Sequence, residues 1–399
     1  MGLLNGTMSL RYYRVEGDLP KSYREEFLAQ MKKFAFRELA AEKELSIGWV
    51  RPENFLDVDF REENLFQNQY LTCTLRIDSK KIDGKLFRAL FDREHEKLKK
   101  ETNRERVKPF ERKEIKERIQ KKLLAEAMPT RRLYDVCWDV PAGRMYFFAT
   151  ADRLQDTFRE QFEKCFHMTA NGLTVKGRFE AVTGETMPPD LEDPGREFLQ
   201  WLYWRTDQEG GKFKLPKSGE VHLWVEDRMF FKEPGQEDPQ PGTPRPASTT
   251  LAGGDPARAP EARASLAGGK RLSKVKLGLK RGEREWSFVL DGETLDVTAL
   301  KIPALFTEEE DEKLFERLAL LEEASFVVEE LFGDYAAARL SDDWERKDQA
   351  WQQRWIQEGA PAGASGGSRK AATEAGAARK SKPAPKLAAR VASKKSRKR

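Results

Sequence analysis

Two segments of the chain align with each other without a gap at an offset of 135 residues. They lie in LRYYRVEGDLPKSYREEFLAQMKKF at 10–34 and RMYFFATADRLQDTFREQFEKCFHM at 144–168, where residues 10–33 coincide with residues 145–168. Tyr12 coincides with Phe147, and YREEF in the first segment coincides with FREQF in the second. Each segment has the pattern of a strand, a short polar turn and a helix with an apolar residue at every fourth position. The sequence therefore predicts an α+β fold with two related strand-helix halves facing one another. Convergent amphipathicity of two unrelated helices gives the same pattern.

The most charged stretch expected to be ordered lies between these segments. It reads KLFRALFDREHEKLKKETNRERVKPFERKEIKERIQKKLLAEAM at 85–128, and the proline at Lys108-Pro109 divides it into two helices. From Asp92 to Lys122 it holds thirteen Lys or Arg and eight Asp or Glu, a local surplus of +5. A projecting helical hairpin with a basic strip along a phosphate backbone is one interpretation. A solvent-facing pair of helices with internal ion pairs is the other.

Two further stretches have the composition of disordered chain. Residues 233–270 are rich in Pro, Gly, Ala and Ser and have almost no large apolar residue, which predicts a flexible linker. Residues 359–399 contain twelve Lys or Arg and one Glu, so they carry +11. Because the whole chain is +5, residues 1–358 carry −6. A basic tail of this kind binds polyanions such as DNA or RNA through counterion release, and it also serves as a solubility tail or a localisation signal.

Residues that could carry catalysis or bind a metal are scattered. Cys73, Cys137 and Cys165 form no CxxC pair, and the three histidines are far apart, so we expect reduced, buried thiols and no metal site. The chain has no phosphate loop with Walker spacing, no nucleophile elbow and no His-Glu-x-x-His. We expect no catalytic residues and no cofactor. No stretch is apolar enough to span a membrane, which predicts a soluble, cytoplasmic protein.

An aromatic-rich stretch follows the second strand-helix segment, GREFLQWLYWRTDQEGGKF at 195–213. Asp193 is suited to cap a helix and Pro194 to open it. Phe198 and Trp201 then fall on one helical face. Large aromatics at helical spacing are more often core than an exposed platform for stacking nucleic-acid bases, so we expect this face to be buried.

Several collinear motifs give the chain a resemblance to the RdgC family. They are IGWVRPENF at 47–55, YLTCTLRIDSKKIDGKLFRALFDREHEKL at 70–98, the charged hairpin ending KKLLAEAM, VCWDVPAGRMYFFAT at 136–150, LQWLYWRTDQEGGKFKL at 199–215, VHLWVEDRMFF at 221–231, KVKLGLKRGEREWSFVLDGETLDVTALKIP at 274–303 and ASFVVEELFGDYAAARL. Order and spacing fit over most of residues 1–345. The linker and the basic tail are additions to the family pattern.

The resemblance implies a non-enzymatic DNA-binding protein of the α+β class. Family members are expected to form a ring-shaped homodimer around or against duplex DNA, with single-stranded DNA as a second ligand. They bind with little sequence preference and antagonise RecA by occupying its substrate, so association with the nucleoid is implied. A protein-interaction scaffold tethered to the nucleoid by its tail is the alternative function. A DNA-processing enzyme is a further one.

These considerations divide the chain and select the candidate DNA-binding residues. The predicted parts are a first α+β half at 1–84, the hairpin at 85–128, a second α+β half at 129–232, the linker at 233–270, a strand-helix region at 271–358 and the tail at 359–399. By its position in the family pattern, the hairpin supplies Lys97, Lys99, Lys100, Arg104, Arg106, Lys108, Arg112, Lys113, Lys116, Arg118, Lys121 and Lys122. The tail supplies Lys394, Lys395, Arg397, Lys398 and Arg399.

Overall fold

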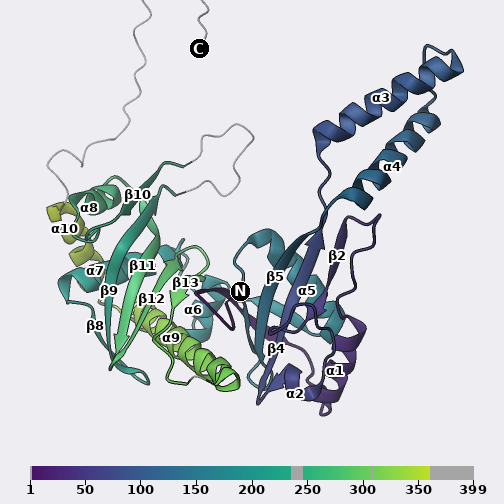
Figure 1. The fold of residues 1–399 in the computed structure, drawn as a ribbon. Helices are drawn as coiled ribbons and strands as arrows, with labels where there is room; N and C mark the ends of the chain where they lie inside the picture. Colours follow the sequence, from purple (N-terminus) through teal and green to yellow (C-terminus); the bar gives the residue numbers. More distant parts are fainter. Residues whose placement is uncertain (1, 235–245, 308, 360–399) are drawn as a thin grey trace, which may run out of the picture. The chain divides into compact units, whose positions relative to one another are not determined.

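One antiparallel β-sheet runs through the part of the chain that the computed structural model describes, residues 2–234, 246–307 and 309–359 (Figure 1). Its strand order is β10 (Ser248–Ala252), β9 (Gly219–Lys232), β11 (Arg271–Arg281), β12 (Arg284–Asp291), β13 (Val297–Lys301), β1 (Met8–Glu16), β6 (Arg144–Phe147), β5 (Thr130–Asp139), β4 (Tyr70–Ser79) and β2 (Leu45–Val50). Three short strands pair outside this order: β3 (Phe66–Gln67) with β4, β7 (Thr169–Gly172) with β1, and β8 (Lys212–Leu215) with β9. The predicted α+β class is confirmed.

Strand β1 connects the N-terminal and C-terminal parts of the sheet. Met8 and Leu10 pair with β13, and the next four residues, from Arg11 to Arg14, pair with β6. Because side chains alternate along a strand, Tyr12 and Tyr13 enter different hydrophobic cores. Tyr13 packs in the N-terminal core, and Tyr12 packs in the larger C-terminal core.

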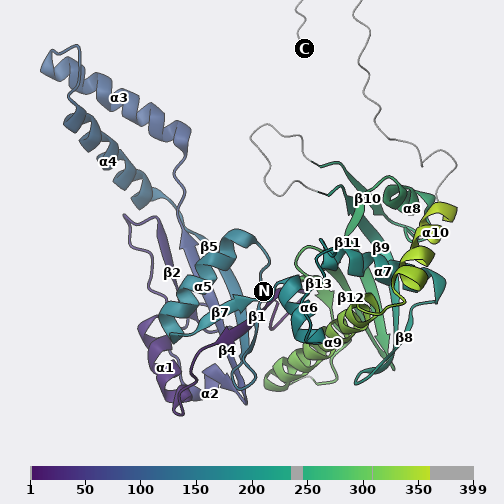
Figure 2. The same ribbon diagram turned by 180° about the vertical axis from the view of Figure 1, so that it is seen from behind.

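The two aligned segments both form a strand followed by a helix, as predicted. The first is β1 with α1 (Tyr23–Lys33), and the second is β6 with α5 (Asp152–Phe166). They are immediate neighbours: β1 and β6 pair antiparallel, and Phe27 of α1 contacts Phe166 of α5 with ring centroids 5.1 Å apart. Figure 2 shows α1 and α5 beside the N-terminal strands. The segments therefore build one core together instead of standing in two facing halves.

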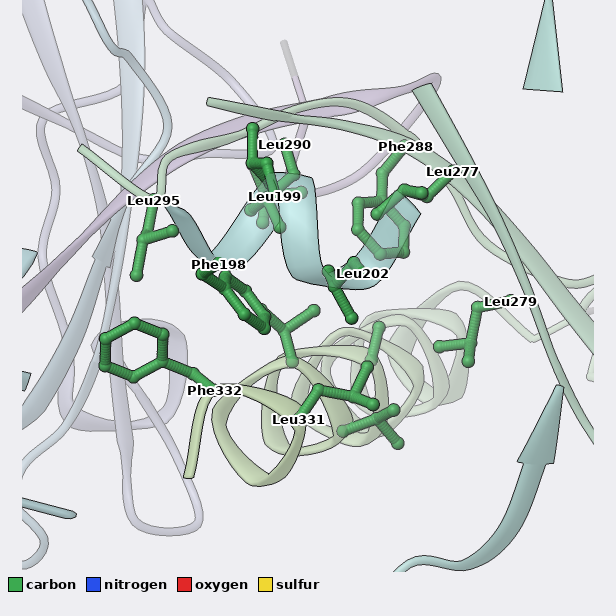
Figure 3. Close-up of a cluster of buried hydrophobic side chains, with 14 of the residues drawn as sticks. Phe198, Leu199, Leu202, Leu277, Leu279, Phe288, Leu290, Leu295, Leu331 and Phe332 are labelled. Atoms are coloured by element: carbon green, nitrogen blue, oxygen red, sulfur yellow. The ribbon is translucent and has the colours of Figure 1, made fainter. Parts of the chain in front are cut away.

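A second group of helices packs on the C-terminal strands. It consists of α6 (Val175–Thr183), α7 (Pro194–Gln208) and α9 (Glu310–Arg339). In Figure 3, Phe198 and Leu202 of α7 lie between the strand residue Leu277 and Phe332 of α9. The carboxylate of Asp193 accepts a hydrogen bond from the backbone N–H of Arg196 at the start of α7, as the capping pattern predicts.

The aromatic side chains of α7 are core residues. Phe198, Trp201, Tyr203 and Trp204 are all buried. The guanidinium of Arg205 packs over the Trp201 ring, 4.9 Å from its centroid. The prediction of a buried helical face is confirmed, and this stretch offers no exposed platform for bases.

The prediction of a continuous linker at 233–270 is wrong for its second part. Residues from 246 onward form β10, which pairs with β9, and α8 (Pro260–Ala267), which buries Ala262 and Leu266. The chain ends its described part in a short π-helical turn, η1 (Glu345–Gln349), and α10 (Ala350–Gly359). Trp355 of α10 lies against α8, with the Arg263 guanidinium 4.9 Å from its ring centroid. The small side chains of α8 can form part of a core because the large side chain of Trp355 packs against this helix. Residues 235–245 and the predicted tail beyond Gly359 lie outside the described residues.

The three cysteines are free and buried, as the sequence predicts. Burial raises the pKa of the Cys73 and Cys137 thiols well above the ordinary value. Among the described helices none is both long and apolar enough to cross a membrane.

The charged stretch forms the predicted helical hairpin. It consists of α3 (Gly84–Thr102) and α4 (Pro109–Glu126). The hairpin is inserted between β4 and β5, which pair with each other along their whole length from Tyr70 and Asp139 to Ser79 and Thr130. Residues on either side of the hairpin therefore belong to one sheet, and the hairpin extends from its end (Figure 1). A single helical turn, α2 (Glu62–Leu65), precedes β3.

Candidate nucleic-acid interface

Local hydrogen bonds define the ends of both hairpin helices. The Asp83 carboxylate accepts hydrogen bonds from the first backbone N–H groups of α3, those of Lys85 and Leu86. Helix α3 ends at Asn103, whose left-handed φ of 51° is typical of a residue that terminates a helix. Pro109 opens α4, and the Glu111 carboxylate accepts a hydrogen bond from the Lys108 backbone N–H at 2.9 Å. The turn at 103–108 is thus specified by the sequence around it.

A small hydrophobic core holds the two helices together. Ile115, Ile119 and Leu123 on α4 are buried. They pack against partly buried residues on and before α3, which are Ile82, Phe87, Leu90, Phe91 and Leu98. This cluster is separate from the two cores of the sheet. The hairpin therefore has its own packing, and its remaining side chains are available to solvent.

Polar contacts fix the base of the hairpin to the sheet. The Lys80 ammonium donates hydrogen bonds to the carbonyl oxygens of Ala41 and Leu124, at 2.9 and 2.8 Å. Gln120 donates to the Glu44 carboxylate at 2.7 Å. These bonds join α4 to the chain segment that precedes β2, so the basic side chains are carried on an anchored arm.

Half of the twelve predicted hairpin residues have a carboxylate partner. The pairs are Lys97 with Glu101, Lys99 with Glu96, Arg104 with Glu111, Lys113 with Glu117, Arg118 with Glu94 and Lys121 with Glu42, at nitrogen–oxygen distances of 3.0–3.9 Å. Both side chains of the Lys113–Glu117 pair are mostly exposed. Exposed pairs of this kind contribute about 0–1 kcal/mol, so a phosphate can displace the carboxylate at little cost.

The other six predicted residues have no carboxylate oxygen within 4.0 Å among the described residues. They are Lys100, Arg106, Lys108, Arg112, Lys116 and Lys122. All six are exposed. The ion pairs expected in the second interpretation are thus present at six of the twelve predicted residues, and the other six keep the exposed charge expected in the first.

The structure brings three of the predicted residues together in one groove. Arg112, Lys113 and Lys116 line a groove of about 570 Å³ between α3 and α4. The Arg112 guanidinium lies 5.5 Å from the centroid of the Phe91 ring, which limits the directions in which it can point. Asp92 is the one carboxylate in the lining. The groove thus combines three predicted cations with an aromatic wall.

Sequence reasoning missed one cation in this groove. Arg88 of α3 lines it, is exposed and has no carboxylate partner in the described structure. The predicted set began at Lys97 because the count of charges began at Asp92. The spacing of Gly84, Arg88 and Asp92 at every fourth position on α3 is the signal that places Arg88 on the same face.

The pKa of one acidic side chain on the hairpin is lowered by a basic neighbour. The Lys99 ammonium donates a hydrogen bond to the Glu96 carboxylate at 3.0 Å and holds the pKa of that carboxyl below its ordinary value. Glu96 is therefore a charged carboxylate at neutral pH. Lys99 is therefore less available to a phosphate than the unpaired Lys100 beside it.

Two predictions concern the basic tail and metal binding. The tail residues Lys394, Lys395, Arg397, Lys398 and Arg399 lie outside the described part of the chain. Within that part, no three His, Cys, Asp or Glu residues lie close enough together to hold a metal ion. The structure gives no residue set to which a metal could be assigned.

Comparison with known protein families gives a match. The sequence model of the family described as "Putative exonuclease, RdgC" matches residues 8–182. This range begins with β1, contains the whole hairpin and ends in α6. No curated protein matches the chain.

Proposed function

We propose that the protein is a recombination-associated protein of the RdgC family that binds DNA irrespective of its sequence, because residues 8–182 match the sequence model of that family. The family match and the basic groove concern the same part of the chain, because the hairpin lies inside the matched range.

The observation that carries the proposal is the group of unpaired cations in the hairpin groove. Among the described residues, Arg88, Arg112 and Lys116 have no carboxylate partner, although residues 1–358 carry a net charge of −6. Contacts between such side chains and phosphates position a protein on DNA and carry no sequence information. Binding through this groove therefore predicts equal affinity for duplexes of unrelated sequence, measured by fluorescence anisotropy at one stated salt concentration. A preference of more than tenfold among such duplexes would contradict it.

We extend the proposal to two copies of the chain that encircle or coat duplex DNA and so keep a RecA-type recombinase from its substrate. Light scattering gives the mass in solution and separates a dimer from a monomer. Competition between linear and covalently closed circular duplex then tests encirclement, because a closed ring loads poorly on DNA without ends. Equal loading on both forms would limit the protein to coating.

Truncation of the chain after Glu358 is expected to lower DNA affinity and to leave a protein that still binds. The tail carries +11, so its loss removes cations that release counterions from DNA, while the hairpin groove remains. The measurement is the dissociation constant of both proteins for the same duplex over a range of salt concentrations. Complete loss of binding would favour the alternative of a protein-interaction scaffold that the tail tethers to DNA.

We also propose that the protein binds DNA without cutting it, although the matched family is described as an exonuclease. The groove that supplies the unpaired cations is lined by one carboxylate, Asp92, whereas two-metal hydrolysis needs several carboxylates to hold its ions. End-labelled linear duplex is expected to keep its length when incubated with the protein and magnesium. Shortening that stops when the magnesium is chelated would overturn this part of the proposal.

A further inference from the structure

A cavity of about 350 Å³ lies where the N-terminal and C-terminal cores meet. Its lining comes from β1, β6, α6 and α9, and the segment after β12 contributes Leu295. No residue of the hairpin contributes to the lining. Figure 2 shows α6 next to α9 on this side of the sheet.

One side chain in this cavity is a buried cation with no carboxylate oxygen within 4.0 Å among the described residues. Arg178 of α6 is only 8% exposed, and no hydrogen bond of its guanidinium to another described residue exists. Its Nε is buried and without a partner. The guanidinium lies over the Tyr12 ring, 4.9 Å from the centroid, and burial lowers its pKa from the ordinary value. Buried charges are normally paired, and Glu329 in the same lining makes no ion pair with Arg178, so an anion in the cavity would supply the missing hydrogen-bond acceptor.

The lining of the cavity holds more basic than acidic side chains. Arg14 and Arg144 line the same cavity and are exposed, and Glu329 is the one acidic residue in the lining. Arg144 has carboxylate neighbours at 3.7 Å in Asp139 and at 4.0 Å in Glu322. Arg14 has no ion pair among the described residues. Within the lining itself, three arginines therefore face one glutamate, while Asp139 and Glu322 lie beside Arg144 outside the lining.

The rest of the wall is apolar. It is formed by Leu173, Val182, Leu295, Val328 and Phe332, together with two alanines. Leu295 has a left-handed φ of 55°, which is strained for a leucine. Such strain persists where the surrounding structure over-determines a backbone position, and it is commonest at ligand sites.

We propose that this cavity binds an organic monoanion, a carboxylate attached to an apolar chain or ring. The carboxylate would take its hydrogen bonds from Arg178, with Arg14 and Arg144 at the mouth, and the apolar part would lie against Val328 and Phe332. This chemistry has two sources. One is a small fatty or aromatic acid, and the other is the C-terminal carboxylate of a peptide whose last side chain is large and apolar.

Titration calorimetry of the full chain with sodium octanoate tests the proposal, with octanamide as the neutral probe of the same shape. Octanoate is expected to bind at least about tenfold more tightly than octanamide, since hydrogen bonds to charged groups are the stronger ones. Arg178→Met is expected to weaken octanoate binding by about the same factor. Arg153→Met removes an exposed arginine of α5 outside the cavity and serves as the matched control with wild-type binding.

A second variant keeps the test independent of the stability of the core. Val182 lies at the mouth and is 48% exposed, so Val182→Asp is compatible with folding and places a negative charge beside the site. It is expected to abolish octanoate binding. A peptide that ends in leucine, as free acid or as amide, identifies the source: competition by the acid form alone assigns a peptide terminus, and its failure to compete assigns a small acid.

Three results would overturn the proposal. These are absence of octanoate binding at millimolar concentration, equal binding of octanoate and octanamide, and wild-type affinity in both Arg178→Met and Val182→Asp.

Discussion

Replacing Lys113 and Lys116 with glutamate is expected to weaken DNA binding equally at every sequence and to lower the salt slope of binding by about two units, one for each phosphate contact removed. Both lysines line the hairpin groove and are exposed. Between 50 and 200 mM salt, two such contacts account for roughly a tenfold change in affinity. The double change also brings negative charge next to Arg112, so the loss at low salt exceeds that of simple neutralisation.

The measurement is anisotropy of two labelled duplexes of unrelated sequence at several potassium chloride concentrations. The matched control is Lys164→Glu with Lys176→Glu. These lysines are also exposed, lie on helices and face a glutamate four residues away, at 3.6 and 3.9 Å. The control changes the net charge by the same amount but lies outside the groove. A slope that falls equally in both double variants would show that net charge, and not the groove, determines binding.

Replacing Asp78 with alanine is expected to lower the free energy of unfolding by about 3–5 kcal/mol. This is the largest loss of stability that we expect from replacing a single buried polar residue. Arg76 and Asp78 on β4 are both 1% exposed. Two hydrogen bonds join them, at 3.0 Å from Nε and 2.7 Å from Nη2. The guanidinium also lies 3.9 Å from the centroid of the Phe36 ring and donates to the carbonyl oxygen of Phe55. Without the carboxylate, a buried positive charge loses its main partner.

Urea unfolding at equilibrium measures this loss. Asp59→Ala is the matched control, because Asp59 also pairs with an arginine two residues away, at 2.8 Å, but on the surface, and its loss is expected to leave the midpoint unchanged. The double variant Arg76→Met with Asp78→Leu is expected to recover most of the stability, since it removes both charges. If the double variant were as unstable as Asp78→Ala, the instability would come from lost packing and not from an unpaired buried charge.

Structural features that depend on residues close together in the chain could be predicted from the sequence. The division of the hairpin followed from Pro109 and the helical spacing around it, and the start of α7 followed from Asp193 and Pro194. Strand pairing could not be predicted in this way. Leu10 pairs with Val297, and nothing near either residue specifies that partner. For the same reason, the aligned segments gave the right elements but not their position side by side in one core.

Composition misjudged the region from 246 to 270. Its alanines, glycines and prolines cannot form a core alone, but β10 completes its hydrogen bonds on β9, and α8 packs against Trp355. Trp355 is distant from α8 in sequence, whereas β9 is the strand that precedes β10. The candidate DNA-binding set shows a similar limit: the basic residues could be named, but their availability depends on contacts between helices. Arg118, for example, pairs with Glu94, 24 residues away, at 3.1 Å.

Because the hairpin packs on its own small cluster, its length is free to change without any adjustment in the sheet. Inserting one helical turn in each arm would move the tip outward by about 5.4 Å while β4 and β5 kept their register. Relatives could thus adapt to polyanions of different girth by lengthening or shortening this one insertion, and the rest of the protein would remain as it is.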